Sequence, residues 1–190
     1  MPLKQKRLQR LVHETLRLIG EDPRREGLRR TPERVARAWN ELTEGYDVDV
    51  KKLINGALFS APDSELVMVS DIQFYSLCEH HLLPFFGKVH VAYIPDGKII
   101  GLSKIPRLVN AYARRLQVQE HLTSDLANVL EEVLKPQGLG VIVEARHLCM
   151  EMRGARSVKS PTITSAMRGA FKADARTRKE FLDLLNRPPR

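Results

Sequence analysis

The chain opens with apolar side chains at helical spacing. In the first stretch these positions are Leu8, Leu11, Val12, Leu16 and Ile19. Their recurrence every three or four residues predicts an amphipathic helix over residues 4–19. Gly20 follows directly and is the type of residue that commonly ends a helix.

A second helix is predicted after Thr31-Pro32, because Thr31 can serve as N-cap and Pro32 can occupy the first helical position. Its apolar stripe consists of Val35, Ala38, Trp39 and Leu42. We expect Gly45 to end it. The two helices predict an antiparallel N-terminal helical arm over residues 1–60, ahead of a domain over residues 61–190.

From Leu66 the apolar positions change to strict alternation, which is typical of a β-strand. The alternation places Val67 and Val69 on one face. It places Leu66, Met68 and Ile72 on the other face. We expect this strand to enter a turn at Cys78.

The following stretch predicts a second strand over residues 88–94. Asp96-Gly97 then indicates a hairpin turn, with a returning strand over residues 98–101. Two helices are expected next, one introduced by Ser103 and one beginning near Thr123.

Residues 139–150 are rich in β-branched side chains and alternate in polarity, which predicts a strand. Because alternate side chains share a face, His147 and Cys149 should point the same way. A strand over residues 162–167 and a helix over residues 174–185 complete a β-β-α-α-β-β order. The fold class is therefore α+β.

Composition limits the number of domains and the cellular location that we expect. The chain has 190 residues, 43% of them hydrophobic, which is enough for one domain with a core of its own. Its two cysteines do not make a disulfide framework, so we expect a reducing, cytoplasmic location. Without a long apolar run, neither a signal peptide nor a membrane span is expected.

The formal net charge is +8, which suits nucleic acid, an anionic membrane surface or a polyanionic small substrate. No RNA-binding or helix-turn-helix signature accompanies the charge, so a nucleic-acid partner is not expected. Charge alone does not choose among the remaining partners.

The most informative residues are metal-ligand types. Cys78 and His81 have the C-x-x-H spacing that lets one turn present two ligands to zinc, and Cys149 can supply a third. A buried cysteine or histidine is more often an ordinary core residue, but two such groups together favour a metal. Structural zinc usually has four protein ligands, so three predict a catalytic zinc with an open position. A structural site would need His80 or His147 as the fourth ligand.

Such a zinc ion would lower the pKa of a bound water from about 15.7 to roughly 7 and so provide hydroxide at neutral pH. His80 and His147 would then be free to transfer protons. The three-ligand set therefore predicts hydrolytic chemistry.

Two further clusters suggest substrate contacts. Gln119-Glu120 lies between two predicted helices, where the Glu120 carboxylate could accept hydrogen bonds from an N–H pair such as guanine N1 and N2. An ordinary exposed acid is the alternative.

The second cluster is Ser103-Lys104-x-x-Arg107 at a predicted helix start. Backbone N–H groups there favour anions, and two cations one turn apart add to the effect. We expect a phosphate site at this cluster, which Arg153 could join.

Several sequence blocks occur together in a fixed order. They are Cys78-Glu79-His80-His81-Leu82-Leu83-Pro84-Phe85, Gly101-Leu102-Ser103-Lys104-Ile105-Pro106-Arg107, Gln117-Val118-Gln119-Glu120, Glu144-Ala145-x-His147-x-Cys149-Met150, Arg153-Gly154, and Thr162-x-Thr164-Ser165 with Gly169-x-Phe171. In these blocks the chain resembles the GTP cyclohydrolase I family. The resemblance extends over most of the sequence, from the segment 27–34 onward.

The resemblance implies a tunnelling fold, with an antiparallel sheet that carries helices on one face. It also implies a homodecamer of two pentamers with active sites between subunits. The reaction would convert GTP and water to formate and 7,8-dihydroneopterin triphosphate, the first step toward folate and related pterins.

The resemblance also implies a role for each matching residue. Zinc would be bound by Cys78, His81 and Cys149, and protons would be transferred by His80 with the help of His147. Gln119 and Glu120 would hold the guanine edge, and the triphosphate would be bound by Lys104, Arg107 and Arg153. Ser103 would lie near the ribose and phosphates and act as a catalytic residue in the later sugar rearrangement. A basic residue of segment 27–34 could reach a neighbour's triphosphate. One departure is His121, where the family usually has arginine.

Two alternatives stay open. One is a structural-zinc protein that binds a nucleotide or nucleic acid. The other is a different purine or pterin enzyme of the tunnelling fold.

Overall fold

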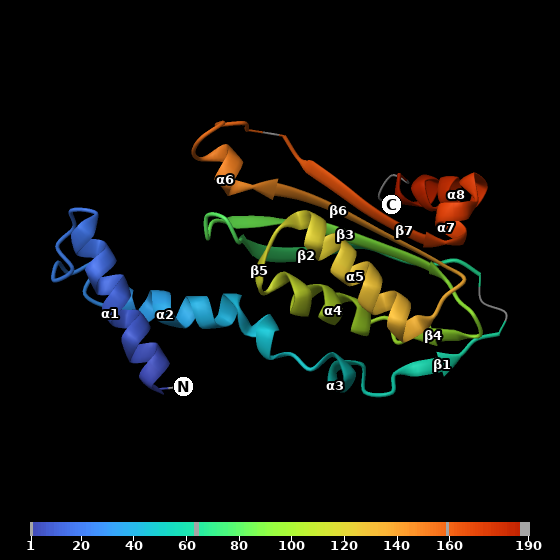
Figure 1. The fold of residues 1–190 in the computed structure, drawn as a ribbon, viewed down its shortest axis with the longest axis horizontal. Helices are drawn as coiled ribbons and strands as arrows, with labels where there is room; N and C mark the ends of the chain where they lie inside the picture. The colour runs from blue at the N-terminus through green and yellow to red at the C-terminus, as the bar shows by residue number, and fades with distance from the viewer. Residues whose placement is uncertain (1, 63–64, 159, 187–190) are drawn as a thin grey trace. The chain divides into compact units, whose positions relative to one another are not determined.

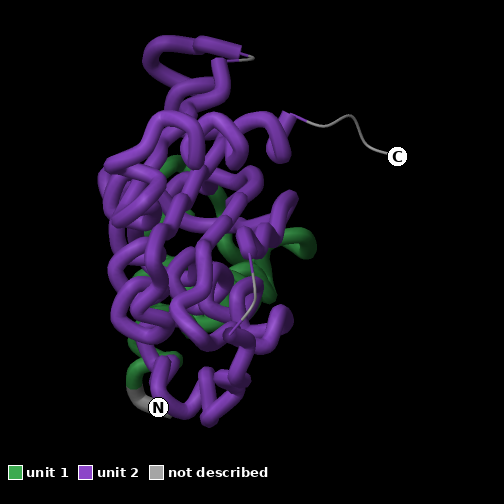
Figure 2. The backbone as a smooth tube through the Cα atoms, turned by 90° about the vertical axis from the view of Figure 1, so that its right-hand side faces the viewer, with its two compact units in different colours: residues 1–44 green, residues 45–190 purple. Residues whose placement is uncertain are grey.

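The computed structural model describes residues 2–62, 65–158 and 160–186 (Figure 1). The chain folds into two compact units, residues 1–44 and residues 45–190 (Figure 2). Among the described residues, no helix combines the length and the apolar character needed to cross a membrane.

The first unit consists of two helices that pack against each other, α1 (Pro2–Leu18) and α2 (Thr31–Leu42). Gly20 ends the first of them, as predicted. It has a φ of +90° and donates its N–H to Arg17 O at 3.0 Å, while Glu21 N–H reaches Leu16 O at 2.9 Å. This pair of hydrogen bonds is a Schellman motif, which a glycine accommodates without strain.

The boundaries of α2 differ from the prediction. Arg30 is the N-cap, and Thr31 is already helical. The Thr31 hydroxyl instead donates to Gly27 O at 3.4 Å, so it is not available to cap the helix. The helix ends at Leu42 with Thr43 as C-cap, before Gly45.

The second unit is built on a five-stranded sheet in the order β5-β2-β3-β6-β7. The strands are β2 (Val67–Cys78), β3 (Pro84–Ile94), β5 (Leu116–Gln117), β6 (Gly138–His147) and β7 (Thr162–Gly169). All pairings are antiparallel except that of β5 with β2. The predicted β-β-α-α-β-β order and the α+β class are confirmed.

Helices cover the sheet on both faces to different extents. The long helices α4 (Lys104–Ala113) and α5 (Gln119–Leu134) pack side by side on one face and enclose the main core with it (Figure 1). A smaller apolar cluster on the other face joins Ala92 and Ile142 to Phe171 and Phe181. The latter two come from α7 (Ala170–Ala173) and α8 (Ala175–Leu185).

The remaining elements are short. They are η1 (Glu44–Asp47), α3 (Val50–Ile54), β1 (Leu58–Ser60), β4 (Lys98–Ile100) and α6 (Leu148–Glu151). Strands β1 and β4 form a separate two-stranded sheet. The predicted hairpin of β4 with β3 at Asp96-Gly97 is therefore wrong. Strand β3 is hydrogen-bonded to β2 on one side and β6 on the other, so it has no free edge for β4.

A β-bulge interrupts the alternation in β2. The register against β3 shifts between Val69 and Ile72, and Asp71 adopts a φ of +56°. Val69 and Ile72 consequently face the same core, although they are three positions apart and strict alternation would place them on opposite faces. The predicted placement of Ile72 on the face of Met68 is wrong, because Met68 packs in the smaller cluster.

His90 on β3 is a buried titratable group on the side of the sheet away from the main core. It is 4% exposed, and its Nδ1 accepts the Asp71 N–H at 3.2 Å. Its Nε2 has no partner among the described residues. Burial lowers the pKa of His90; Lys88 adds to this effect, and the carboxylates of Asp71 and Glu144 oppose it.

We expect this histidine to make stability depend on pH. Below a pH of about 6.5 the unfolded chain binds a proton that folded His90 resists. The free energy of unfolding should thus fall on acidification, by at most about 1.4 kcal/mol per pH unit from this group. Urea unfolding should be measured at about pH 7.5 and about pH 5.5. The free energy of unfolding should fall less between these two pH values in His90→Gln than in the parent protein. Equal losses in the two proteins would refute the assignment.

Candidate metal centre and active site

The candidate metal ligands and the residues around His147 meet at one end of the main sheet. Ser103 and Lys104 do not, because they follow β4, whose Ile100 N–H donates to Tyr93 near the other end of β3 (Figure 1). Cys78 ends β2 and is paired with Gln117 of β5. On the next two strands Phe85 is paired with His147. Strand register therefore brings together segments that are distant in the sequence.

A tight turn after β2 presents the first two candidate ligands. Cys78 O accepts the N–H of Leu82 at 2.8 Å, and Cys78 N–H donates to Leu83 O at 2.9 Å. Leu82 adopts a φ of +55°, which lets the chain reverse at this point. The turn places His81 Nδ1 3.7 Å from Cys78 Sγ.

Cys149 approaches the same point from α6. The predicted strand over residues 139–150 is wrong at its end, because β6 stops at His147 and one helical turn follows. The ligand atoms of Cys78, His81 and Cys149 all lie within 4.8 Å of one another. This group could hold a metal ion.

The chemistry of the donors suits a metal. Burial raises the pKa of Cys149, and the neighbouring Cys78 thiol raises it further. A cation between the two sulfurs would reverse this effect, since metals bind the thiolate. Cys78 is buried and His81 is exposed, so the group is open on one side.

His147 is fixed by two neighbours. Its ring stacks on Phe85 with 4.8 Å between centroids and 2° between planes. Its Nε2 lies 2.7 Å from Gln119 Oε1. Burial lowers the pKa of His147, against the opposing charges of Glu120 and Glu151, and so favours the neutral imidazole.

Gln119 defines the tautomer of that imidazole. It is 1% exposed, and its Nε2 is surrounded by acceptors: Val143 O at 3.0 Å, Thr162 O at 3.0 Å and Thr164 Oγ1 at 3.1 Å. The amide nitrogen must face these acceptors, so Oε1 faces His147. His147 therefore carries its proton on Nε2 and leaves Nδ1 as an acceptor.

Gln119 and Glu120 form the first turn of α5. The prediction that they precede a helix beginning near Thr123 is wrong, because the extended Val118 is the N-cap and accepts Leu122 N–H. Glu120 is exposed, whereas Gln119 points inward. Glu120 therefore remains available to a ligand.

His80 lies beside the ligand turn and is exposed. Its Nε2 is 3.8 Å from Glu79 Oε1, and its ring centroid is 6.1 Å from that of His81. An exposed imidazole one residue from a candidate ligand can exchange protons with solvent.

The predicted phosphate contacts occupy the start of α4 and the segment after α6. Ser103 is the N-cap of α4 without a side-chain capping bond and is exposed, as is Arg107. Lys104 Nζ donates to Leu53 O at 2.7 Å, so a phosphate would compete with that carbonyl. Arg153 is exposed.

Sequence reasoning missed several partners of these residues. Phe85 and Thr164 belong to recognisable blocks, but only strand register reveals that they contact His147 and Gln119. Thr123 Oγ1 also lies 2.6 Å from Thr164 Oγ1. Alternation alone carried no signal for these contacts.

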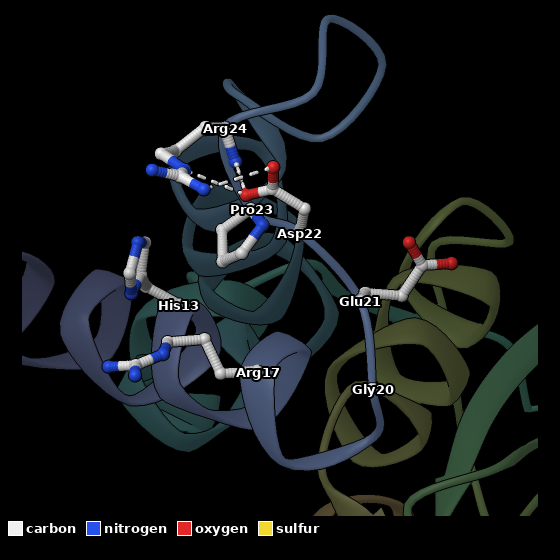
Figure 3. Close-up of a pocket in the computed structure, with 7 residues that line it drawn as sticks. All are labelled: His13, Arg17, Gly20, Glu21, Asp22, Pro23 and Arg24. Atoms are coloured by element: carbon white, nitrogen blue, oxygen red, sulfur yellow. Dashed lines mark hydrogen bonds and ion pairs between the residues drawn. The ribbon is translucent and has the colours of Figure 1, made fainter.

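A separate hollow of about 640 Å³ lies within the first unit (Figure 3). Its lining residues are His13, Arg17, Gly20, Glu21, Asp22, Pro23 and Arg24. Arg24 and Asp22 form an ion pair at 3.0 Å, and Glu21 pairs with Arg25 at 2.9 Å. The carboxylates offset much of the positive charge, and none of the predicted site residues lines this hollow.

Known proteins are similar to this chain over most of its length. The sequence profile of the GTP cyclohydrolase I family matches residues 8–186. GTP cyclohydrolase 1 of Campylobacter curvus is 58% identical over 177 residues, 93% of each chain. The Leptospira biflexa protein of the same name is 55% identical over 178 residues, 94% of this chain and 97% of its own. The solved apo structure of archaeosine synthase QueF-Like matches 56% of this chain and 96% of its own, with 21% identity and a TM-score of 0.46.

Proposed function

The chain belongs to the GTP cyclohydrolase I family, and we propose that Cys78, His81 and Cys149 hold a zinc ion in its active site. Its activity is that of the family, the conversion of GTP and water to formate and 7,8-dihydroneopterin triphosphate. The observation that carries the site assignment is the convergence of two sulfurs and one imidazole nitrogen within 4.8 Å.

Zinc fits this donor set, since two thiolates and one imidazole are ligands it prefers. When bound, it would lower the pKa of a water molecule and supply a nucleophile at neutral pH for attack on guanine C8. The exposed side of the group leaves room for water and substrate. Addition of water at C8 would break a C8–N bond of the guanine imidazole ring, and C8 would then leave as formate.

The two histidines outside the ligand set would move protons. Neutral His147 can accept a proton at Nδ1, because Nε2–H already donates to Gln119 Oε1. Exposed His80 would protonate the opening imidazole ring of the substrate. Its exposure allows it to regain a proton from solvent.

We expect Gln119 to act by orienting His147, because its amide groups are already hydrogen-bonded. Gln119→Glu should place a carboxylate against two carbonyl oxygens and raise the pKa of His147. We predict a fall in kcat of about 10² and a pH profile displaced to higher pH, since a correctly positioned acid–base group typically contributes about 10² to 10⁴ to the rate. Stopped-flow or steady-state pterin formation measures both.

Thr164→Val is the matched control, because it removes one acceptor from Gln119 and leaves the His147 bond in place. It should keep kcat within about threefold of the parental value, since two acceptors still hold the amide. A Gln119→Glu enzyme with parental kcat and pH profile would contradict the orienting role.

The substrate contacts follow from charge and exposure. Glu120 would accept the guanine N1 and N2 hydrogens. The neighbouring Gln119 side chain points inward and contacts His147. Ser103 lies at a helix start that favours the ribose and phosphates, and the triphosphate would be bound by Lys104, Arg107 and Arg153.

We also infer a homodecamer of two pentamers with sites between subunits. Large apolar side chains near the ligand turn and α6 are exposed in the single chain, namely Leu82, Met150 and Met152. Covering by a neighbour would remove them from water, and a basic residue of segment 27–34 could arrive from that neighbour. Sedimentation should give a decamer, and a stable active monomer would overturn the inference. The thiolate ligands point to a reducing, cytoplasmic location.

X-ray absorption at the metal edge tests the site directly. We expect stoichiometric zinc with two sulfur ligands, one imidazole and one light-atom ligand from solvent. Four protein ligands with no solvent ligand would instead indicate a structural zinc site.

A further inference from the structure

Arg146 and Glu151 form a two-point ion pair that spans the segment carrying Cys149. Arg146 Nε donates to Glu151 Oε1 at 2.8 Å, and Nη2 donates to Oε2 at 2.6 Å. The Arg146 side chain is 51% exposed, but that of Glu151 is only 9% exposed. The carboxylate is therefore held in place under the guanidinium.

The guanidinium itself rests on the sheet. Its Cζ lies 5.8 Å from the centroid of the Phe86 ring, and Phe86 stacks on Tyr75 at 5.9 Å. Arg146 and Phe86 are direct partners in the register of β6 and β3. The pair thus connects α6 to the part of the sheet that also carries His147.

Helix α6 needs such a connection. It is a single turn, with Met152 N–H to Leu148 O at 3.0 Å as its helical bond, and Ser157 N–H to Met150 O at 3.0 Å holds it from the other side. One turn does not stabilise itself, because the first turn fixes several dihedrals for one hydrogen bond. Cys149 sits in the middle of this turn.

We propose that the Arg146–Glu151 pair is a positioning element that holds Cys149 Sγ at the metal site. Arg146 precedes the turn and Glu151 ends it, so the pair closes the chain around Cys149. The inference rests on the proposed metal site. Exposed ion pairs usually add little to the free energy of unfolding. A two-point pair with one partner nearly buried also fixes the relative orientation of the two side chains.

The test uses the full-length protein and measures zinc affinity by competition with a chromophoric chelator. Glu151→Gln keeps the shape and removes the charge. We expect its zinc dissociation constant to rise about 10- to 100-fold, as for other groups that orient metal ligands. The thiolate-to-metal absorption band of the Co²⁺-loaded protein should shift or weaken as well.

Two further variants make the result specific. The exchange Arg146→Glu with Glu151→Arg should restore zinc affinity to within about threefold, because it rebuilds the two-point pair. Asp183→Asn removes the Lys179–Asp183 pair of α8, which has a 2.6 Å contact but lies outside this segment, and should leave the affinity unchanged. Arg146→Lys keeps the positive charge but loses the pair of N–H donors that contacts both carboxylate oxygens. It replaces Glu151→Gln if that variant does not fold.

Parental zinc affinity and a parental Co²⁺ spectrum in Glu151→Gln, or no recovery in the exchange variant, would overturn the proposal. If the parent protein itself binds no zinc, the proposed metal site fails instead. The two failures are therefore distinguishable.

Discussion

Cys149→Ala is expected to lose zinc and turnover together. The substitution removes one of three candidate ligands and leaves Cys78 and His81, which are too few for a stable site. In the proposed mechanism the metal would supply the nucleophile, so GTP turnover should fall by about 10³ or more. Metal analysis after gel filtration and a formate assay on the same sample measure both losses.

Met150→Ala is the matched control for this variant. Met150 is 37% exposed in the same turn and is not a candidate ligand, so its removal should leave zinc content at the parental value. Turnover that persists in rigorously metal-free Cys149→Ala protein would show that the metal is not needed for the reaction.

Glu120→Gln is expected to reduce kcat/KM for GTP by about 10⁴, because sites built around a substrate's N–H groups discriminate at this level. The amide that replaces one carboxylate oxygen would direct N–H groups at guanine N–H groups. Glu120 is exposed in the first turn of α5, so the free energy of unfolding should change little. Steady-state kinetics with GTP measure the loss.

Glu132→Gln makes the same chemical change at an exposed position near the other end of α5. It should leave kcat/KM unchanged. If Glu120→Gln also retained parental kinetics, the guanine contact would have to be reassigned.

Much of this architecture follows from local pattern. Helical spacing with Gly20 predicted α1 and its end, and alternation identified the long strands of the sheet. The grouping of Cys78, His81 and Cys149 was also predictable, because few residue types bind zinc and the chain contains only two cysteines. In that case the small number of side chains that can bind zinc left few possible ligand sets.

Pairing between distant segments was not predictable in the same way. The Asp96-Gly97 turn is a genuine local signal, yet β4 pairs with β1 because β3 already has neighbours on both edges. The bulge at Asp71 reverses the alternation of β2, and the sequence contains no glycine at this position that would have predicted it. Both outcomes depend on the whole sheet.

The site shows the same division. Glu120 was identified by its charge, but the role we propose for Gln119 depends on three acceptors contributed by β6 and β7. The stacking of His147 on Phe85 depends on strand register. Contacts of this kind require the folded chain.

The most direct test of the proposed zinc-dependent reaction is to incubate purified zinc-loaded protein with GTP and follow formate release and the pterin chromophore, with a chelated sample alongside. We predict equal amounts of formate and 7,8-dihydroneopterin triphosphate in the loaded sample and neither product in the chelated one. Zinc-loaded protein that yields neither product, or chelated protein that yields both, would contradict the proposed function.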